Sequence, residues 1–297
     1  MTKVEILSEE EWRAREAAHT DRMRAWTEPH RQRRSRGEKH PVLDFLFTYY
    51  SFPPTRLERW QPGPGVVLTG PGARRFLDRP GYRETAEGVT LDLSAFSDRL
   101  ARNARYSLSL LEAIHSRRAR VDCFGLHEWA MVYRTRPEQV RHAQVPLRLG
   151  HAGTDAVVES LNVRCSHFDA FRFFTPDARP LNQFTPTRER QRELDQPGCL
   201  HVGMDLYKHA YKLDPFVPSE LLGDCFALAV EIRELDMRAS PYDLSAYGYS
   251  PVPIEKAEGR AVYARAQASF ARRARPLRER LITLCRTLLT ENHHSSC

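Results

Sequence analysis

Residues 219–237, with the sequence SELLGDCFALAVEIRELDM, follow directly after Pro218. Apolar side chains recur in this stretch at the spacing of an amphipathic helix: Leu222, Phe226, Ala229, Val230 and Leu235. A proline just before the first turn is a common start signal, because its missing N–H is not needed there. The stretch therefore predicts a long helix that ends near Met237.

Two further long helices are expected on either side of this one. A helix from about Glu255 toward the C-terminus is expected to be interrupted or kinked at Pro276, because proline cannot donate to the helical ladder. Near the N-terminus, Ser8 and Glu11 have the spacing of a capping box. They predict a helix over residues 9–26 that is stopped by Pro29.

The remaining pattern adds a small β component. Residues 66–68, 88–93 and 156–165 are expected to be strands, and a helix capped by Ser94 is expected to reach His115. We therefore predict a mainly α fold with a small β component (α+β), as a single compact domain over residues 1–297. Residues 1–40 form its N-terminal helix and basic segment, and residues 41–292 form its core.

Composition limits the class of protein. The chain has 297 residues, 41% of them hydrophobic and 28% charged, which is enough for a sizeable core. No apolar run approaches the ~18 residues of a membrane helix, and six cysteines are too few for a disulfide scaffold. We expect a cytoplasmic protein without a membrane partner; its oligomeric state is not predicted.

The charge pattern favours arginine strongly. Lys and Arg total 45 and only five are lysines, with a formal net charge of +7, a bias typical of a GC-rich genome. A basic stretch contains Arg31, Arg33, Arg34 and Arg36. It is either a solvated linker or a segment that contacts the phosphates of a nucleic acid.

Aromatic side chains are dense between His40 and Pro53. In VLDFLFTYYSF, residues 42–52, most rings fit a helical core pattern. Tyr49 and Tyr50, next to the Pro53-Pro54 stop, have a second interpretation as the wall of a pocket that stacks on a flat ligand.

Three segments hold most of the reactive side chains. Each places a histidine just after a cysteine and adds a carboxylate: Cys123, His127 and Glu128; Cys165, His167 and Asp169; Cys199, His201 and Asp205. A zinc-protease motif is excluded, because the residue four positions after His127 is Met131. A structural Cys/His zinc site requires wider spacing than Cys-x-His, so buried thiols packed as small hydrophobes are the simpler interpretation.

A mixed metal site is the second interpretation of the same segments. His201, Asp205 and His209 recur every four residues and would share one helix face. Together with His127 and His167 they are a candidate iron or zinc centre with an open position. For each histidine alone, a satisfied structural role is the simpler alternative.

The third segment also joins a carboxylate to amines. Asp205 precedes Lys208 and Lys212, which lie between tyrosines. This is either a solvated helix face or a site in which Asp205 activates water and Lys208 binds phosphate or acts as a nucleophile. In the second segment, Ser166 is expected to cap a short helix with Asp169 in its first turn, and Phe171 is expected in the wall of a base-sized pocket.

These blocks, with His40-Pro41 and the Asp44–Ser51 stretch DFLFTYYS, resemble a bacterial family from GC-rich genomes that is labelled 3-methyladenine DNA glycosylase. The resemblance extends over about residues 11–289 and includes Arg238-Ala239-Ser240-Pro241-Tyr242-Asp243-Leu244. It implies a hydrolase in DNA repair that flips a damaged base into an aromatic pocket and breaks the glycosidic bond with the help of a carboxylate. The Gly-rich hairpin of the helix-hairpin-helix glycosylases is not found, so no residue role is carried over from them.

The first hypothesis is therefore a DNA N-glycosylase-like enzyme acting on alkylated bases, with DNA as partner and no cofactor. Its catalytic candidates are Asp205, Glu128, Asp169, His127, His167, His201 and Lys208; its substrate-binding candidates are Tyr49, Tyr50, Trp129, Tyr207 and Phe171; its DNA-binding candidates are Arg31, Arg33, Arg34, Arg36, Arg172 and Lys212. The alternatives are an Fe- or Zn-dependent enzyme acting on a small molecule and a non-catalytic nucleic-acid-binding protein.

Overall fold

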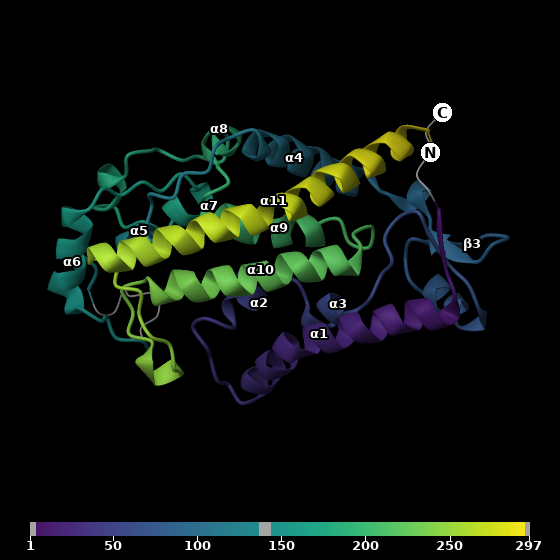
Figure 1. The fold of residues 1–297 in the computed structure, drawn as a ribbon, viewed down its shortest axis with the longest axis horizontal. Coiled ribbons are helices and arrows are strands. Elements are labelled where there is room, and N and C mark those ends of the chain that lie inside the picture. The colour runs from purple at the N-terminus through teal and green to yellow at the C-terminus, as the bar shows by residue number, and fades with distance from the viewer. Residues whose placement is uncertain (1–3, 137–143, 295–297) are drawn as a thin grey trace. The chain divides into compact units, whose positions relative to one another are not determined.

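The computed structural model describes residues 4–136 and 144–294, with side chains up to residue 291. Its elements, in chain order (Figure 1), are β1 Glu5–Leu7, α1 Glu9–Ser35, α2 Phe45–Tyr49, α3 Pro54–Glu58, β2 Val66–Leu68, η1 Pro71–Asp78, β3 Tyr82–Glu84, β4 Val89–Leu91, η2 Leu93–Ala95, α4 Asp98–His115, α5 Leu126–Ala130, α6 Gly150–Ser160, α7 Phe168–Phe171, η4 Arg179–Leu181, α8 Gln191–Leu194, α9 Leu200–Tyr211, α10 Ser219–Arg238, η5 Ser245–Tyr247 and α11 Ala257–His294. The η elements are 3₁₀ helices. The predicted mainly α fold with a small β component is confirmed.

The chain divides into two compact units. The first contains the chain up to Leu111, Leu206–Ala227 and the chain from Leu277 onward; the second contains Glu112–Asp205 and Leu228–Pro276. The division falls within α4, α9, α10 and α11. No helix in the described residues has the length and apolar character needed to cross a membrane.

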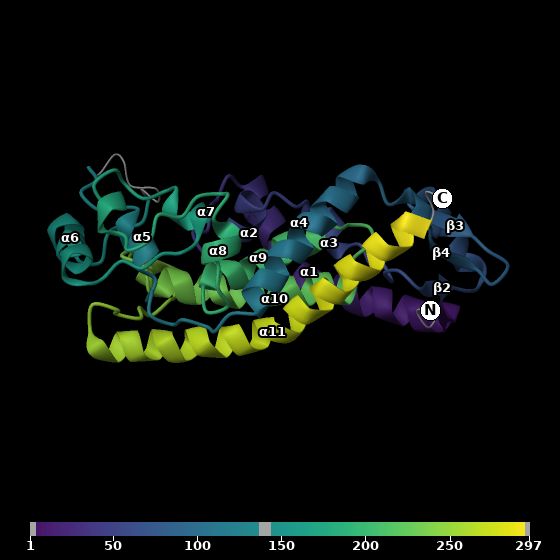
Figure 2. The ribbon, with the colours of Figure 1, turned by 90° about the horizontal axis from the view of Figure 1, so that it is seen from above.

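The first unit contains the only sheet among the described residues. Its strands lie in the order β1-β2-β4-β3, with β1 parallel to β2 and the other neighbours antiparallel. Figure 2 shows β2, β4 and β3 beside one another. The sheet packs on Trp12 and Phe76, whose rings meet edge to face at 5.6 Å, and the Trp12 indole donates to Thr69 O at 2.9 Å.

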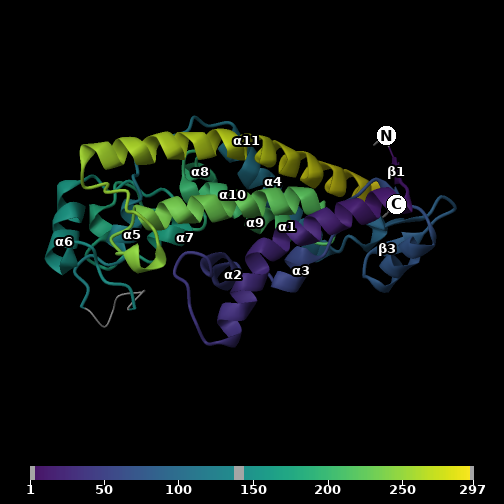
Figure 3. The same ribbon diagram turned by 60° about the horizontal axis from the view of Figure 1, so that its bottom comes forward.

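Helix α1 begins as predicted but continues beyond Pro29. Ser8 and Glu11 form the expected capping box, yet Pro29 lies inside the helix, which changes direction in its last turns (Figure 3). The extra turns are retained because His30 and Arg33 both bind the Asp44 carboxylate, at 2.9 and 2.5 Å. These tertiary contacts therefore compensate for the backbone hydrogen bond that Pro29 cannot donate within the helix. In α11, Pro276 is likewise inside the helix rather than at its end.

In the second unit, two local predictions are wrong. Residues 150–160 form α6 rather than part of a strand, because buried Thr154, Val157 and Val158 have helical spacing despite their β-branched side chains. Ser166 does not cap α7: the helix begins at Phe168 with His167 in the N-cap position and no side-chain cap bond. The predictions for α10 and for strands at 66–68 and within 88–93 are confirmed.

Candidate functional site

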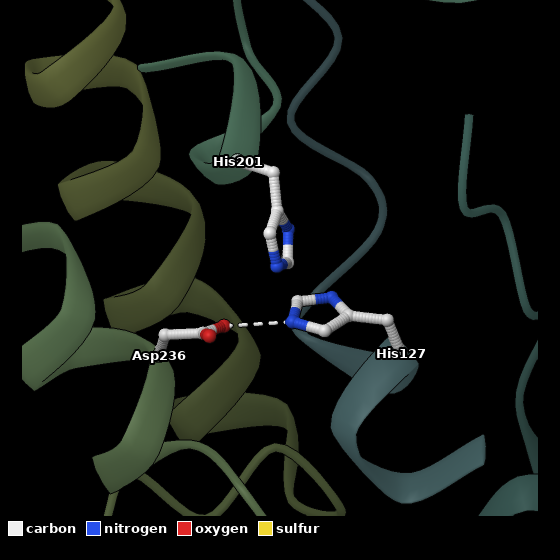
Figure 4. Close-up of side chains that lie close together, drawn as sticks. All are labelled: His127, His201 and Asp236. Atoms are coloured by element: carbon white, nitrogen blue, oxygen red, sulfur yellow. Dashed lines mark ion pairs between the residues drawn. The ribbon is translucent and has the colours of Figure 1, made fainter. Parts of the chain in front are cut away.

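Two histidines and one aspartate converge inside the second unit. His127 comes from α5, His201 from the first turn of α9 and Asp236 from α10 (Figure 4). One ligand atom from each lies within 4.8 Å of the other two. Asp236 is fully buried and His127 is 5% exposed. These are residue types and separations that suit a single metal ion.

Short helices and close packing fix the positions of these side chains. Gly125, at φ 72°, precedes α5 in a left-handed conformation, and a β-carbon there would lie 3.2 Å from the Tyr263 ring. The buried Trp129 indole donates to Ala239 O at 2.9 Å, which ties α5 to the end of α10. His127 is therefore presented by a helix that is held at both ends.

The contact between His127 and Asp236 is close but does not have hydrogen-bond geometry. His127 Nε2 lies 2.9 Å from Asp236 Oδ1, an ion-pair distance, and neither buried atom has a further hydrogen-bond partner among the described residues. Burial is the largest single influence and raises the pKa of Asp236, but the contact with His127 and the charges of His201 and Arg233 together outweigh it and hold that pKa below its usual value. For His127, burial is the largest influence and acts downward, but the Asp236 and Glu128 carboxylates together raise its pKa.

A buried arginine balances the acidic groups. Arg233 Nη1 donates to Glu128 Oε1 at 2.9 Å and to Asp236 Oδ2 at 3.2 Å. Arg233 and Asp236 are three residues apart on α10 and so share one helix face. The second carboxylate oxygen of Asp236 is thereby oriented, and its first oxygen faces His127.

His201 differs from His127 in its charge state. Its ring lies edge-on to His127, with centroids 4.5 Å apart, and stacks on His167 at 5.3 Å. Burial, then the His127 charge, lowers the pKa of His201 well below its usual value. His201 is therefore a neutral imidazole near pH 7 and retains a nitrogen lone pair.

A second group adjoins the first through His167. Ligand atoms of His167, Asp169 and Asp205 lie within 4.8 Å of one another. His167 Nδ1 is 3.1 Å from Asp195 Oδ1 and its Nε2 is 3.6 Å from Asp205 Oδ2. Two of the three predicted carboxylates therefore gather around the predicted histidine, whereas Glu128 lies with Arg233.

A pocket opens beside the first group. Its empty volume, including the open part, is about 370 Å³, and it is lined by His127, His201, Arg120, Arg164, Asp122, Cys123, Cys165, Cys199, Ser166, Gln196 and Leu200. Arg164 is paired with Asp122 at 2.6 Å, and the guanidinium of Arg120 lies over the Phe184 ring at 4.9 Å. The pocket gives access to the histidines and is bordered by cationic groups.

Most other predicted site residues lie elsewhere. Trp129 is fully buried and offers no ring face to a ligand; Phe171 contacts Phe174 at 5.2 Å. Arg172 is 3.3 Å from Asp169 and lies over the Phe173 ring.

The remaining predicted binding residues belong to the first unit. In it, Tyr49 stacks on Phe45 at 5.0 Å, and Tyr207 is buried against Tyr50 at 5.5 Å. Lys208 is half-buried in α9, and Lys212 is exposed just beyond it. Of the basic stretch, Arg31 pairs with Glu58 and Arg33 with Asp44, while Arg34 and Arg36 are exposed.

Asp236 is the site residue that sequence reasoning missed. Asp236 lies in the stretch that was interpreted only as an apolar helix, about one turn after Arg233. A carboxylate and an arginine on the buried face of such a helix are a usable signal, because charged residues are seldom fully buried unless they are paired. Asp195, which contacts His167, was missed as well and has no comparable signal.

Comparison of the chain with protein-family models, with curated proteins and with solved structures found no match.

Proposed function

We propose that this chain is a metal-dependent enzyme in which His127, His201 and Asp236 hold a divalent transition-metal ion, Fe(II) or Zn(II), and act on a small molecule. The observation that carries the proposal is the convergence of these three ligand atoms within 4.8 Å. His127 Nε2 and Asp236 Oδ1 meet there without hydrogen-bond geometry. Buried polar atoms in proteins are rarely left without a partner, and a bound metal ion would coordinate both of these atoms.

The ligand set leaves room for chemistry. Two imidazoles and one carboxylate occupy one side of an ion and leave open positions, as in non-haem iron oxygenases and catalytic zinc sites. Such an ion supplies Lewis acidity, a water of lowered pKa or, for iron, oxygen activation. The chain contributes a neutral His201 toward the pocket, a buried Asp236 and an Arg233 that fixes the carboxylate.

The principal competing interpretation is a purely structural ion network. Arg233, Glu128, Asp236 and a protonated His127 would balance their own charges. That network does not need His201, which adds a second imidazole nitrogen to the same space and is held neutral there. A metal ion accounts for all three convergent atoms.

The charged side chains of the pocket wall indicate the class of substrate. Arg120 and Arg164 in this wall favour a substrate with an anionic group.

Metal binding is the direct test. The full-length chain, stripped by chelator, is titrated with Fe(II) under anaerobic conditions and with Zn(II), and the bound metal is measured by elemental analysis. We expect one ion per chain, and an affinity reduced by more than about 100-fold in His127→Ala, His201→Ala and Asp236→Asn, since even outer partners of a metal site change affinity 10–100-fold.

His30→Ala is the matched control for these variants. His30 is also buried and lies 2.9 Å from an aspartate, but in the first unit. It should leave metal binding unchanged. Binding that survives Asp236→Asn, or that is lost equally in His30→Ala, contradicts the proposal.

DNA base excision is a second candidate, favoured by the gathering of Asp169 and Asp205 around His167. Asp205→Asn should then abolish release of a methylated base from alkylated duplex DNA and leave DNA binding intact. No release by the parent chain, or release undiminished by the substitution, would count against base excision. DNA binding that survives alanine at Glu128, Asp169 and Asp205 without any base release would instead identify a non-catalytic nucleic-acid-binding protein.

A further inference from the structure

Three cysteines from distant parts of the chain line a single pocket. Cys123 precedes α5, Cys165 precedes α7 and Cys199 precedes α9, and all three belong to the wall of the pocket in the second unit. Cys165 and Cys199 are buried and Cys123 is half-buried. Burial is the main cause of the raised pKa of Cys165 and of Cys199. Cys123 also raises the pKa of Cys165, and Cys123 and Cys165 both raise the pKa of Cys199. The thiols therefore face a common space.

Side-chain amides hold Cys123, Cys165 and the residue before Cys199. Gln267 Nε2 donates to Cys123 Sγ at 3.2 Å and to Gly198 O at 2.6 Å. Asn182 Oδ1 accepts a hydrogen bond from the Cys165 N–H at 2.8 Å, and Asn182 Nδ2 donates one to Cys165 O at 2.9 Å. These bonds keep the loops that carry the thiols in fixed positions.

The Cys199 loop is also joined to the segment before Cys123. Gln196 Oε1 accepts the Arg120 N–H at 2.8 Å, and Gln196 Nε2 donates to Arg120 O at 3.2 Å. A β-carbon at Gly198 would lie 2.1 Å from Arg120 O, so only glycine permits this approach. The thiols are therefore preorganised, as ligands of a metal centre are.

Burial makes Cys165 and Cys199 poor nucleophiles. Burial raises the pKa of Cys165 to about 12 and that of Cys199 well above its usual value, so both are protonated thiols near neutral pH. A metal centre reverses this state, because thiols that become ligands release their protons to solvent.

The spacing of the thiols indicates which kind of centre fits. The two groups of candidate ligands whose atoms all lie within 4.8 Å contain no cysteine. The three sulfurs are thus too widely placed to share one ion, but a polynuclear cluster presents a separate iron to each thiolate. The Gln267 N–H that points at Cys123 Sγ is the kind of bond that tunes such clusters.

We propose that Cys123, Cys165 and Cys199 ligate an iron–sulfur cluster in this pocket. Three thiolates would leave one iron of a four-iron cluster without a cysteine ligand, and His127 and His201 line the same pocket. The cluster is a second centre, distinct from the ion held by His127, His201 and Asp236, and neither proposal requires the other.

Anaerobic reconstitution tests the proposal. The full-length chain is incubated with Fe(II), sulfide and a thiol reductant, desalted, and assayed for iron, acid-labile sulfide and visible absorbance. We expect several atoms each of iron and sulfide per chain, with one iron in excess of sulfide where the single-ion site is also filled, and broad sulfur-to-iron absorbance. Cys123→Ser, Cys165→Ser and Cys199→Ser should each lose most of both.

Two cysteines outside the pocket provide matched controls. Cys225 and Cys285 are also buried but lie in the first unit, so Cys225→Ser and Cys285→Ser should retain the cluster. Because a serine variant can fail to fold, the unmutated chain is also alkylated before and after reconstitution in mild denaturant. Mass spectrometry should then show protection of Cys123, Cys165 and Cys199 only in the reconstituted sample.

The outcomes separate the two proposals. Asp236→Asn should remove the single ion and leave the cluster, whereas Cys199→Ser should do the reverse. A chain that takes up no sulfide on reconstitution, a cluster that survives all three serine variants, or equal loss in the two control variants would overturn the cluster and leave the proposed function standing.

Discussion

Both units contain a histidine, a carboxylate and an arginine in contact, but the two groups differ in how completely their atoms are satisfied. In the first unit, Asp44 Oδ1 pairs with His30 Nδ1 and accepts from Arg33, and its Oδ2 accepts the His40 N–H at 2.8 Å. Both oxygens of this carboxylate have protein donors.

In the second unit, Asp236 has a donor on one oxygen only. Oδ2 accepts from Arg233, while Oδ1 meets His127 Nε2 without hydrogen-bond geometry, and His201 adds a second imidazole. The same residue types therefore form a closed structural group in one unit and an open ligand group in the other. Hydrogen-bond satisfaction, rather than residue composition, distinguishes the two.

The largest expected effect is on stability, at the buried arginine. Arg233→Leu leaves the Glu128 carboxylate buried without its partner, which should reduce the free energy of unfolding by about 3–5 kcal/mol. Arg33→Leu should cost about 2 kcal/mol or less, because His30 and the His40 N–H still bind Asp44. Urea denaturation measures both. Equal losses would show that the two groups have the same role.

Metal affinity should respond next, through a residue that is not itself a ligand. Glu128→Gln weakens the hold on Arg233 and so releases the Asp236 carboxylate, which should reduce metal affinity about 10-fold, as expected for an outer partner of a metal site. The control is Glu231→Gln on the same helix, whose exposed carboxylate pairs with Arg273. A positioning role also predicts that Glu128→Asp restores part of the affinity, which a merely structural defect would not.

The histidines should give the metal-free chain opposite pH responses. His201 has a lowered pKa in the folded chain, so the unfolded chain takes up its proton first and stability falls as the pH drops below 6.5, with a slope of up to about 1.4 kcal/mol per pH unit. His127 has a raised pKa, so its contribution is present below 6.5 and is lost as the pH rises through the folded value.

Denaturation between pH 5 and 8 separates these contributions. His201→Gln should flatten the acid side of the stability profile, and His127→Gln should flatten the neutral side. A His201→Gln profile that parallels the unmutated chain below pH 6.5 would contradict the neutral state assigned to His201, and with it a condition for metal binding.

Sequence patterns predicted the helices, caps and strands that are determined by residues close together in the chain. Helix α10, the capping box at Ser8 and the strand at 66–68 follow from local spacing, and His127 and His201 were recognised because each sits in a cluster of reactive residues. The extension of α1 beyond Pro29 depends on Asp44, fifteen residues further on, and therefore has no local signal. The histidine partners of Asp236 come from α5 and α9 and give no local signal, so Asp236 could have been found only through Arg233 on its own helix.

The smallest expected effect is on the salt dependence of DNA binding by the arginines close to Asp44. If the basic stretch contacts phosphates, only its exposed side chains are available, so Arg34→Ala and Arg36→Ala should each lower the slope of log affinity against log salt by about 1. Arg33→Ala should leave that slope unchanged, because Arg33 is held by Asp44. Fluorescence anisotropy with a short duplex at several salt concentrations measures the three slopes. A slope change in Arg33→Ala equal to the others would mean that the Asp44 group opens to bind phosphate and is not closed as its hydrogen bonds indicate.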